Sequence, residues 1–331
     1  MLFTRTKSVI IFLILFGPII SMGKTFLKRP QWITNPVPLG VASQRIDTKG
    51  ATDMKVKHAF VCADNGMGEV MLFSDSGEKL WAYPAGATYD VWLLPNGNLV
   101  FTTGNGVKEV TFDNQVVFEY KSKGEVFSCQ PIEDDRFLVS EAAYPRLIEI
   151  DRNGNIHKEI KVIGDSGHFS LRTARKTSYG TYLVGHIGAN AVIEYGSDGK
   201  VLRKIPTPGP AYEAIEIGNG NLLISCKIAV IEVDPNGQIV WNLTHEDVPE
   251  VEPNWFAGIQ RLSNGNTVVC NWLGGAHEGS GVPIFEVNRD KNVVWKFTDT
   301  QVTLHISQCK LINKLPNFHW SNKASRVNRH L

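Results

Sequence analysis

Short apolar segments alternate with tight polar turns along most of this chain. The segment Leu222–Cys226 is typical, because it follows the glycine-containing turn at 218–221 and precedes a second such turn at 234–237. Asn-Gly and Asp-Gly sequences tolerate the positive φ that short hairpin loops require, so each turn predicts a β-hairpin. Further turns of these two kinds stand at 74–77, 94–98, 151–154, 197–199 and 263–266. The pattern predicts an all-β protein.

These hairpins belong to a unit that recurs about every 40 residues. Each unit has an apolar strand, a tight turn, a second strand that ends in polar residues, a loop, a third strand, another tight turn and a fourth strand. An apolar or aromatic residue follows the second turn, as at Trp81, Phe118, Trp241 and Trp295. Four short strands per repeat are typical of a β-propeller blade. We expect these large side chains to pack within and between the blades.

Counting the units gives five that are complete and one that is split between the two ends of the chain. The complete units have first strands expected near Asp90, Phe127, His168, Tyr212 and Phe256. The split unit has its first strand at 305–312 and its other strands at 60–63, 69–73 and 79–83. Pairing the C-terminal strand with the N-terminal strands closes the ring and removes its exposed edges. We therefore predict a six-bladed β-propeller of four-stranded antiparallel blades.

The ends of the chain carry no repeat, and the start has the pattern of a targeting segment. Arg5 and Lys7 precede an apolar run, and small residues follow that run. A run of this length predicts a signal peptide over residues 1–22 rather than a membrane span. We expect an N-terminal extension at 23–57, the propeller at 58–313 and a C-terminal tail at 314–331. The mature chain is then exported to the periplasm or the extracellular space, with no membrane span.

Charge and cysteine content narrow the classes of partner. The 331 residues include 34 basic and 33 acidic side chains, mixed along the chain, so the formal net charge is +1. Without a basic stripe, a nucleic-acid partner is disfavoured, and we expect a monomer. The cysteines lie in apolar strand-like segments, where we expect them to act as small buried hydrophobes. The alternative is that two of them form one disulfide. The cysteines are Cys62, Cys129, Cys226, Cys270 and Cys309.

The repeat resembles a known family. An Asp-x-x-Gly-x-x-x-Trp pattern spans Asp234–Trp241, and a version one residue shorter spans Asp75–Trp81. This pattern is similar to pyrroloquinoline-quinone (PQQ)-like propeller repeats, and the stretch from Asn264 to Trp295 resembles secreted bacterial PQQ-binding-like propellers. The resemblance covers about residues 58–313 and implies the fold. Quinone dehydrogenases have more blades and an adjacent-cysteine pair, which this chain lacks, so we expect no bound quinone.

The connectivity of a propeller sorts its loops onto two rims. Turns between strands one and two, and between strands three and four, share one rim, which we call the turn rim. The longer connections at 207–210, 245–254 and 273–282 share the other, the loop rim. Binding residues concentrate on loops held by a rigid scaffold, so the candidates come from the loop rim. The catalytic candidates are His168, Arg172, Glu213 and His305. The ligand-binding candidates are Tyr89, Asp90, Glu141, His186, Tyr212, Lys227, Trp255, Asn271, Trp272 and His277.

First strands line the central channel of a propeller. We therefore expect His168, Glu213, Trp255 and His305 to meet near its mouth. The next ring outward comes from the ends of second strands, which carry Glu141, His186, Lys227 and Asn271. The structural alternative is that each histidine only forms hydrogen bonds at the surface. A metal site would have to assemble between blades, because no H-x-H or H-E-x-x-H spacing occurs.

Three functional hypotheses follow from these residues. The first is a protein that binds a small polar ligand, and a carbohydrate suits tryptophan and tyrosine beside amides and carboxylates. The second is a glycan- or sulfate-ester-processing enzyme of lyase, hydrolase or sulfotransferase type, in which His168 pairs with Glu213 or Glu141. A divalent metal is compatible with this second hypothesis. The third is a structural interaction module. Convergence of His168, His186 and His305 on one pocket would favour the enzyme.

Overall fold

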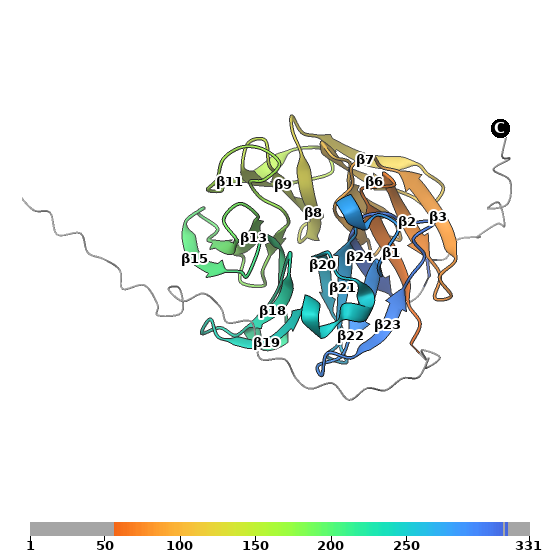
Figure 1. Ribbon diagram of the computed structural model, residues 1–331. Coiled ribbons are helices and arrows are strands. Elements are labelled where there is room, and N and C mark those ends of the chain that lie inside the picture. The colour runs from red at the N-terminus through yellow and green to blue at the C-terminus, as the bar shows by residue number, and fades with distance from the viewer. Residues whose placement is uncertain (1–55, 314, 317–331) are drawn as a thin grey trace, which may run out of the picture.

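Six four-stranded antiparallel sheets form a ring around a central axis (Figure 1). The computed structural model describes residues 56–313 and 315–316. The predicted signal peptide at 1–22, nearly all of the extension at 23–57 and nearly all of the tail at 314–331 lie outside the described residues. Within the described part, no helix has the length and apolar character needed to cross a bilayer. The prediction of a six-bladed, all-β propeller is confirmed.

Blades 1 to 3 follow one another along the chain. Blade 1 contains β4 (Val91–Leu93), β5 (Leu99–Thr102), β6 (Gly106–Val110) and β7 (Val116–Lys121). Blade 2 contains β8 (Val126–Ile132), β9 (Arg136–Glu141), β10 (Arg146–Ile150) and β11 (Ile156–Lys161). Blade 3 contains β12 (Ala174–Lys176), β13 (Tyr182–His186), β14 (Ala191–Tyr195) and β15 (Val201–Pro206).

Blades 4 and 5 complete the run, and blade 6 joins the two ends of the chain. Blade 4 contains β16 (Ala211–Glu216), β17 (Leu222–Cys226), β18 (Ala229–Val233) and β19 (Ile239–Thr244). Blade 5 contains β20 (Trp255–Arg261), β21 (Thr267–Trp272), β22 (Ile284–Val287) and β23 (Val293–Phe297). Blade 6 contains β24 (Ile306–Ile312), β1 (Ala59–Asp64), β2 (Glu69–Phe73) and β3 (Lys79–Pro84). Short 3-10 turns lie at Gly218–Gly220, His245–Asp247, Pro249–Val251 and Gly275–His277.

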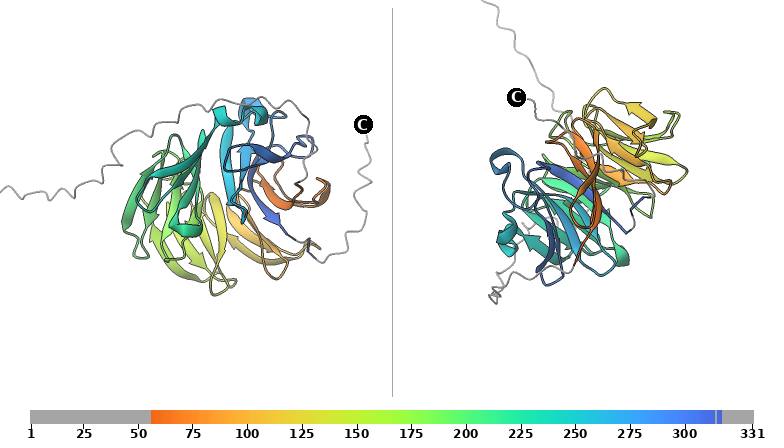
Figure 2. Two further views of the ribbon diagram at one scale, coloured as in Figure 1. Left: turned by 90° about the horizontal axis from the view of Figure 1, so that it is seen from below. Right: turned by 90° about the vertical axis from the view of Figure 1, so that its right-hand side faces the viewer.

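The ring closes as the sequence predicts, because β24 pairs with β1. This antiparallel pair places Cys62 opposite Cys309 and Phe60 opposite Leu311. Figure 1 shows the blue strand β24 beside the orange strands of blade 6, and the turned views in Figure 2 show the same contact between the chain's two ends. The main-chain amides of Leu304 and His305 also donate to the buried Asp64 carboxylate, at 2.7 and 2.9 Å. Blade 6 is therefore built from both ends of the described chain.

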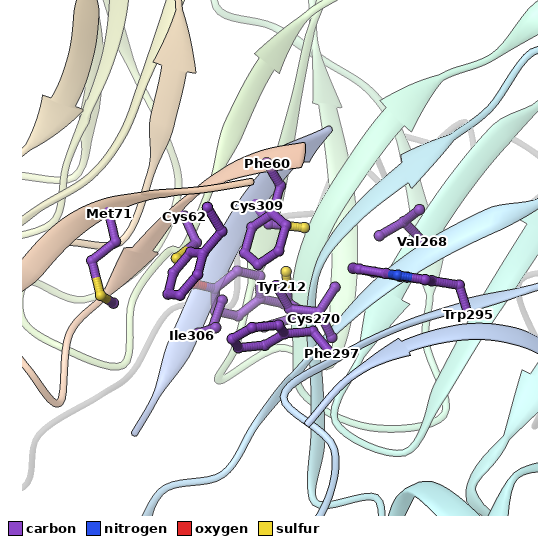
Figure 3. Close-up of a cluster of buried hydrophobic side chains, with 13 residues drawn as sticks. Phe60, Cys62, Met71, Tyr212, Val268, Cys270, Trp295, Phe297, Ile306 and Cys309 are labelled. Atoms are coloured by element: carbon purple, nitrogen blue, oxygen red, sulfur yellow. The ribbon is translucent and has the colours of Figure 1, made fainter. Parts of the chain in front are cut away.

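Apolar side chains fill the space between neighbouring blades. Between blades 5 and 6, Phe60 stacks on Phe73 with ring centroids 4.9 Å apart and meets Phe297 edge-on at 5.1 Å. Cys62, Cys270 and Cys309 lie within this same cluster, as Figure 3 shows. All five cysteines are buried and free, so the reading of them as small hydrophobes is confirmed. Burial also raises the pKa of the Cys62 and Cys270 thiols, which makes them poor nucleophiles.

The inner strands of adjacent blades are linked by side chains that bind the next blade's main chain. The Asp90 carboxylate accepts from the amide of Cys129 at 3.0 Å. The same type of bond joins Glu213 to the Ile259 amide, Gln130 to the Lys176 amide and Gln260 to the Leu311 amide. The inner strand of one blade does not pair with the inner strand of the next, because each blade is a separate sheet. These side chains therefore satisfy buried main-chain groups that would otherwise lack a partner.

One first strand begins later than predicted. The expected strand near His168 is instead a loop, and β12 starts only at Ala174. Gly164 and Gly167 have φ of 134° and 118°, which interrupts an extended strand. The Gly167 amide donates to the Ala142 carbonyl, and Ser170 turns back onto Gly167. His168 therefore lies on a loop of the loop rim rather than at the start of a strand.

Candidate functional site

A cavity of about 290 Å³ lies at the loop-rim mouth of the central channel. Loops and strand ends from five of the blades contribute to it. We call it the loop-rim cavity. Its lining residues are Asn65, Tyr89, His168, Phe169, Arg172, Ile187, Tyr212, Trp255, Trp272 and Ser307. Six of the predicted site residues are among them: Tyr89, His168, Arg172, Tyr212, Trp255 and Trp272.

One wall of the cavity is formed by two tryptophans of blade 5. The rings of Trp255 and Trp272 meet at 81° with centroids 6.3 Å apart. The Trp272 indole donates to the Asn65 side-chain oxygen at 2.9 Å, and that oxygen also accepts from Ser307 at 3.2 Å. Lys227, a predicted ligand-binding residue, lies outside this wall, with its ammonium 5.5 Å from the centre of the Trp255 ring. The wall is therefore aromatic, and a hydrogen bond fixes the Trp272 ring, whereas the buried Trp255 indole nitrogen has no hydrogen-bond partner among the described residues.

The facing wall is organised around Phe127, which is almost fully buried. The Tyr89 ring packs against it at 4.7 Å, and the His168 ring meets it edge-on at 5.5 Å. The Arg172 guanidinium lies over the Phe127 ring, 4.4 Å from its centroid. Such cation–π contacts favour a charge that has lost contact with water. Residues from two connections, β3–β4 and β11–β12, therefore meet on one aromatic support in β8.

Burial sets the protonation behaviour of the polar groups in the cavity. It raises the pKa of Tyr89, with Glu125 acting in the same direction and Arg172 against it. It also raises the pKa of Tyr212, whose hydroxyl lies deeper. Burial lowers the pKa of Arg172, and Tyr212, Tyr89 and Glu125 oppose that shift. Both tyrosines are therefore neutral hydrogen-bonding groups at physiological pH, beside one desolvated cation.

His168 has a carboxylate partner, but not one of the two that the sequence suggested. Its Nδ1 atom lies 2.9 Å from Glu125, at the entrance to the cavity. The side chains of His168 and Glu125 are 45% and 40% exposed, so the pair contributes little to stability. The predicted partners are elsewhere: Glu213 binds Arg175, and Glu141 binds Arg146 and the Tyr120 hydroxyl. The pairing predicted for His168 is therefore corrected.

Glu213 and Asp90 lie inside the disc rather than at its mouth. Both carboxylates are fully buried, and neither lines the loop-rim cavity. Arg175 donates to Asp90 at 2.8 and 3.0 Å and to Glu213 at 2.8 Å. The Gln308 amide donates to both Glu213 oxygens at 3.0 and 2.9 Å. We call these four residues the channel plug, because they cross the channel from four different blades.

The charge balance of the plug argues for a structural role. Burial alone would raise the pKa of Glu213, but Arg175 and then Lys310 outweigh it, and the net shift is downward. A carboxylate held ionised by a buried arginine is a poor general acid or base at neutral pH. The predicted convergence of Glu213 on the mouth is therefore not observed.

His186 and His305 lie outside the loop-rim cavity, and His186 lines an adjacent pocket of about 470 Å³ together with His168. His186 ends β13 as predicted, is buried, and lies 3.0 Å from the Tyr195 hydroxyl. His305 lies 3.1 Å from Glu278, with its ring 5.2 Å from Trp272. These two histidines flank the cavity without lining it, so the predicted meeting of His305 with His168 at the mouth does not occur.

Asn271, His277 and Glu141 serve other parts of the loop rim. The Asn271 side chain is buried and donates to the carbonyls of Val251, Glu252 and Val282, so it holds two long loops together. The main-chain carbonyl of His277 accepts from Ser280 in the 273–282 loop. Glu141 borders a separate depression beside Tyr120 and Arg146. None of the three lines the loop-rim cavity.

The three histidines of the enzyme hypothesis do not converge. His168, His186 and His305 bind Glu125, Tyr195 and Glu278 respectively. Across residues 56–313, no three side chains of the His, Cys, Asp and Glu types are grouped so that they could hold a metal ion. The geometry therefore gives the divalent-metal hypothesis no support.

A larger hollow of about 970 Å³ lies on the turn rim. It shares no lining residue with the loop-rim cavity, and Arg175 of the channel plug is among its own lining residues. Most of its cations already have partners: Lys176 binds Glu149, while Arg261 and Arg289 both bind Glu232. It is therefore the weaker candidate for a specific site.

Sequence reasoning missed several residues of the loop-rim cavity. Asn65 and Ser307 belong to the split blade, Asn65 directly after β1 and Ser307 within β24. Glu125 occupies the connection before β8, which is equivalent to the connection that carries His168 before β12. Phe169 is 72% exposed and borders the cavity beside His168. Glu125 and Asn65 both lie in connections on the loop rim, so the placement of binding residues on that rim also predicts these two residues.

Comparison with known proteins places the chain by its fold. No family model matches the sequence, and no curated protein shows significant sequence similarity to it. A protein of unknown function from Bacteroides caccae matches with a TM-score of 0.72 and 21% identity, covering 78% of this chain and 100% of that one.

Two further solved structures are more distant. A streptogramin B lyase has a TM-score of 0.53 at 11% identity, covering 74% of this chain and 84% of that one. A chain of a nidogen/laminin complex has a TM-score of 0.58 at 9% identity, and the match covers 76% of this chain and 97% of that one. At sequence identities this low, the matches show a shared fold and say nothing about activity. The chain is a six-bladed β-propeller.

Proposed function

We propose that this protein binds a small polar ligand in the loop-rim cavity, and that the ligand is a carbohydrate. The observation that carries the proposal is the aromatic wall of Trp255 and Trp272 facing polar groups of Tyr89, Arg172 and Tyr212 around one cavity. Aromatic faces stack on the apolar face of a sugar ring, and a few fixed polar groups then set its orientation. The cavity volume of about 290 Å³ is close to the lower end for ligand sites, so it suits one or two rings.

The proposal also includes the location and the oligomeric state of the protein. The predicted signal peptide at 1–22 supports export, and an exported binding protein would meet its ligand in the periplasm or outside the cell. The similarity to PQQ-like repeats supports the blade pattern and adds no quinone site. The protein is proposed to act as a monomer, since each cavity is built from a single chain.

The experiment measures sugar binding with and without the aromatic wall. Trp255→Ala should weaken the binding of oligosaccharides by more than tenfold, because it removes one stacking surface. Titration calorimetry with a panel of mono- and disaccharides, together with tryptophan fluorescence, measures the change. Trp92→Phe, at the turn-rim mouth, is the matched control and should bind like the wild type. Equal binding by the Trp255→Ala variant and the wild type would contradict the proposal.

A second candidate function rests on the pair of His168 and Glu125. Glu125 binds Nδ1, and Nε2 has no hydrogen bond to any described residue. A histidine that is oriented by a carboxylate, lines a cavity and has its other nitrogen without a hydrogen bond has the arrangement of a general base. This supports the enzyme alternative for glycans or sulfate esters. In the same assays, His168→Ala should keep ligand binding and lose any turnover if the pair is catalytic; unchanged turnover would exclude that role.

A further inference from the structure

Arg172 differs from every other arginine in the described part of the chain. Each of the others has a carboxylate oxygen within 4.0 Å. Arg172 has none, although it is only 7% exposed. Buried charges in proteins are normally paired, because leaving water without a partner is unfavourable. An unpaired buried guanidinium at a cavity therefore indicates a missing anion.

The contacts of Arg172 leave one edge of its guanidinium free. Nη1 donates to the main-chain carbonyls of His168 and Leu171. One face of the group lies on Phe127. Nε and Nη2 have no hydrogen-bond partner among the described residues, and neither is one of the sealed, unpartnered polar atoms. Since Arg172 lines the loop-rim cavity, this edge is the part available to a ligand.

The free edge has the shape that recognises oxyanions. Nε and Nη2 point their hydrogens in parallel, so they can donate two bonds to the two oxygens of one carboxylate or sulfate. The nearby carboxylate, Glu125, affects Arg172 electrostatically but is hydrogen-bonded to His168. The neutral hydroxyls of Tyr89 and Tyr212 add donors without adding negative charge. The cavity thus combines one free cation with neutral polar groups and aromatic faces.

We propose that the ligand of the loop-rim cavity is an acidic sugar, whose carboxylate or sulfate group binds the Nε–Nη2 edge of Arg172 while its ring lies against the tryptophan wall. This inference rests on the proposed function and names the class of ligand. Carboxylate and sulfate share the chemistry that the edge recognises, so the test includes both.

The test compares charged and neutral forms of the same ring. Titration calorimetry is carried out with glucuronate, glucose 6-sulfate and glucose, and with galacturonate, galactose 6-sulfate and galactose. We expect at least one acidic sugar to bind roughly 10- to 100-fold more tightly than its neutral counterpart, as hydrogen bonds to a charged group imply. The arm with the larger effect identifies the anion as a carboxylate or a sulfate.

Three variants show whether Arg172 is responsible. Arg172→Met should reduce binding of the acidic sugar to the level of the neutral one. Arg172→Lys keeps the charge but not the fork, and should recover only part of the difference. Arg203→Met, on β15 of the same blade, removes an arginine that binds Glu194 away from the cavity and should bind like the wild type. Thermal unfolding of each variant shows that it is folded.

The outcomes separate this inference from the proposed function. Tighter binding of acidic sugars that is lost in Arg172→Met, partly kept in Arg172→Lys and fully kept in Arg203→Met supports it. Equal binding of acidic and neutral sugars, unaffected by Arg172→Met, overturns it and leaves the proposed function standing. Binding of acidic sugars that persists in a folded Arg172→Met variant also overturns it. If no sugar of either kind binds the wild type, the proposed function fails and this inference fails with it.

Discussion

Arg175 is the residue on which the centre of the disc depends. It is 3% exposed at its side chain and lies between two carboxylates that are fully buried. Burial would lower its pKa, but Asp90 and Glu213 raise it, and the net shift is upward. Removing one member of such a network leaves an uncompensated buried charge, which typically destabilises a protein by about 3–5 kcal/mol. The acidic residues beside it are therefore needed for folding rather than for ligand binding.

His186 is a second buried titratable residue, and it predicts a dependence of stability on pH. The Tyr195 hydroxyl accepts from the Ile163 amide at 3.1 Å, so its own hydrogen points to Nε2 of His186, 3.0 Å away. Burial, aided by Lys204, lowers the pKa of His186 to about 4, although a bond with the Ser170 main chain opposes the shift. The folded state therefore resists protonation of this ring.

The sign of the pH effect follows from this lowered pKa. Between the unfolded pKa of about 6.5 and the folded value of about 4, the unfolded state binds a proton that the folded state does not. The free energy of unfolding should therefore decrease as the pH falls through this window, by at most about 3 kcal/mol from this residue. Urea unfolding at several pH values measures it. His186→Gln should lose less stability than the wild type on acidification, and identical slopes would contradict the assignment.

At the scale of elements, the loop between β21 and β22 fixes the position of Trp272 in the tryptophan wall. A Cβ on Gly274 would lie 2.1 Å from the Trp272 ring, so only glycine lets the indole rest there. Asn254 holds this segment by donating to the carbonyls of Trp272 and Gly274, both at 3.0 Å. The orientation of Trp272 in the cavity is therefore set by its neighbours in the loop.

Gly274→Ala should displace the Trp272 ring and break its bond to Asn65. We expect weaker sugar binding, a shifted tryptophan emission and a loss of about 1–3 kcal/mol of stability, the usual effect of overpacking. Fluorescence titration and urea unfolding measure these changes. Gly218→Ala is the control, because a Cβ there would meet no atom within 4 Å. An unchanged emission spectrum in Gly274→Ala would show that the ring does not depend on this glycine.

Strands and turns could be predicted from the sequence, because each follows from local chemistry. Asn-Gly and Asp-Gly turns, aromatic residues after the second turn and the strand spacing gave the number of blades and the closure. Which side chain faces the mouth could not be predicted. The inner strands β8, β16 and β20 carry register shifts at 126–128, 211–213 and 256–259, and such bulges re-aim side chains. This explains why Tyr212 lines the cavity while Glu213 enters the plug.

The candidate site was predicted in part for the same reason. Strand starts on one rim must meet at the channel, and this rule predicts the aromatic residues and Arg172 at its mouth. It predicts His168 there too, but the partner Glu125 comes from the preceding blade, and no local pattern predicts a contact between blades. A carboxylate in a buried ion pair and a carboxylate at an active site also look alike in a sequence. Only the three-dimensional arrangement assigns Asp90 and Glu213 to the plug.

At the scale of the whole molecule, closure of the ring by β24 should control stability. This strand contributes the buried residues Ile306, Ser307, Gln308 and Cys309, and Gln308 belongs to the channel plug. A chain that ends at Val302 lacks the inner strand of blade 6, so the edge of β1 loses its partner and β20 loses the strand that packs beside it. We expect it to lose several kcal/mol, a large share of the roughly 5–15 kcal/mol of a typical domain, and to lose cooperative unfolding.

Complementation tests this prediction without relying on a failure to fold. A peptide of residues 303–316, added in excess to the shortened chain, should restore cooperative urea unfolding as followed by tryptophan fluorescence. The same peptide with Cys309→Asp should not, since it places a charge in the cluster between blades 5 and 6. Cooperative unfolding of the shortened chain at the wild-type urea concentration would contradict the role given to β24.

The channel plug also has a consequence for how this molecule can change over evolutionary time. Since its four residues are buried and the hollows on the two rims share no lining residue, we expect mutations on the loop rim to have little effect on the turn rim. Residues that line the loop-rim cavity can then be substituted to suit a new ligand without disturbing the packing of the blades. Propellers that share this scaffold would be expected to diverge first in the connections that carry Tyr89, His168 and Trp272, and last in the residues that bind Arg175.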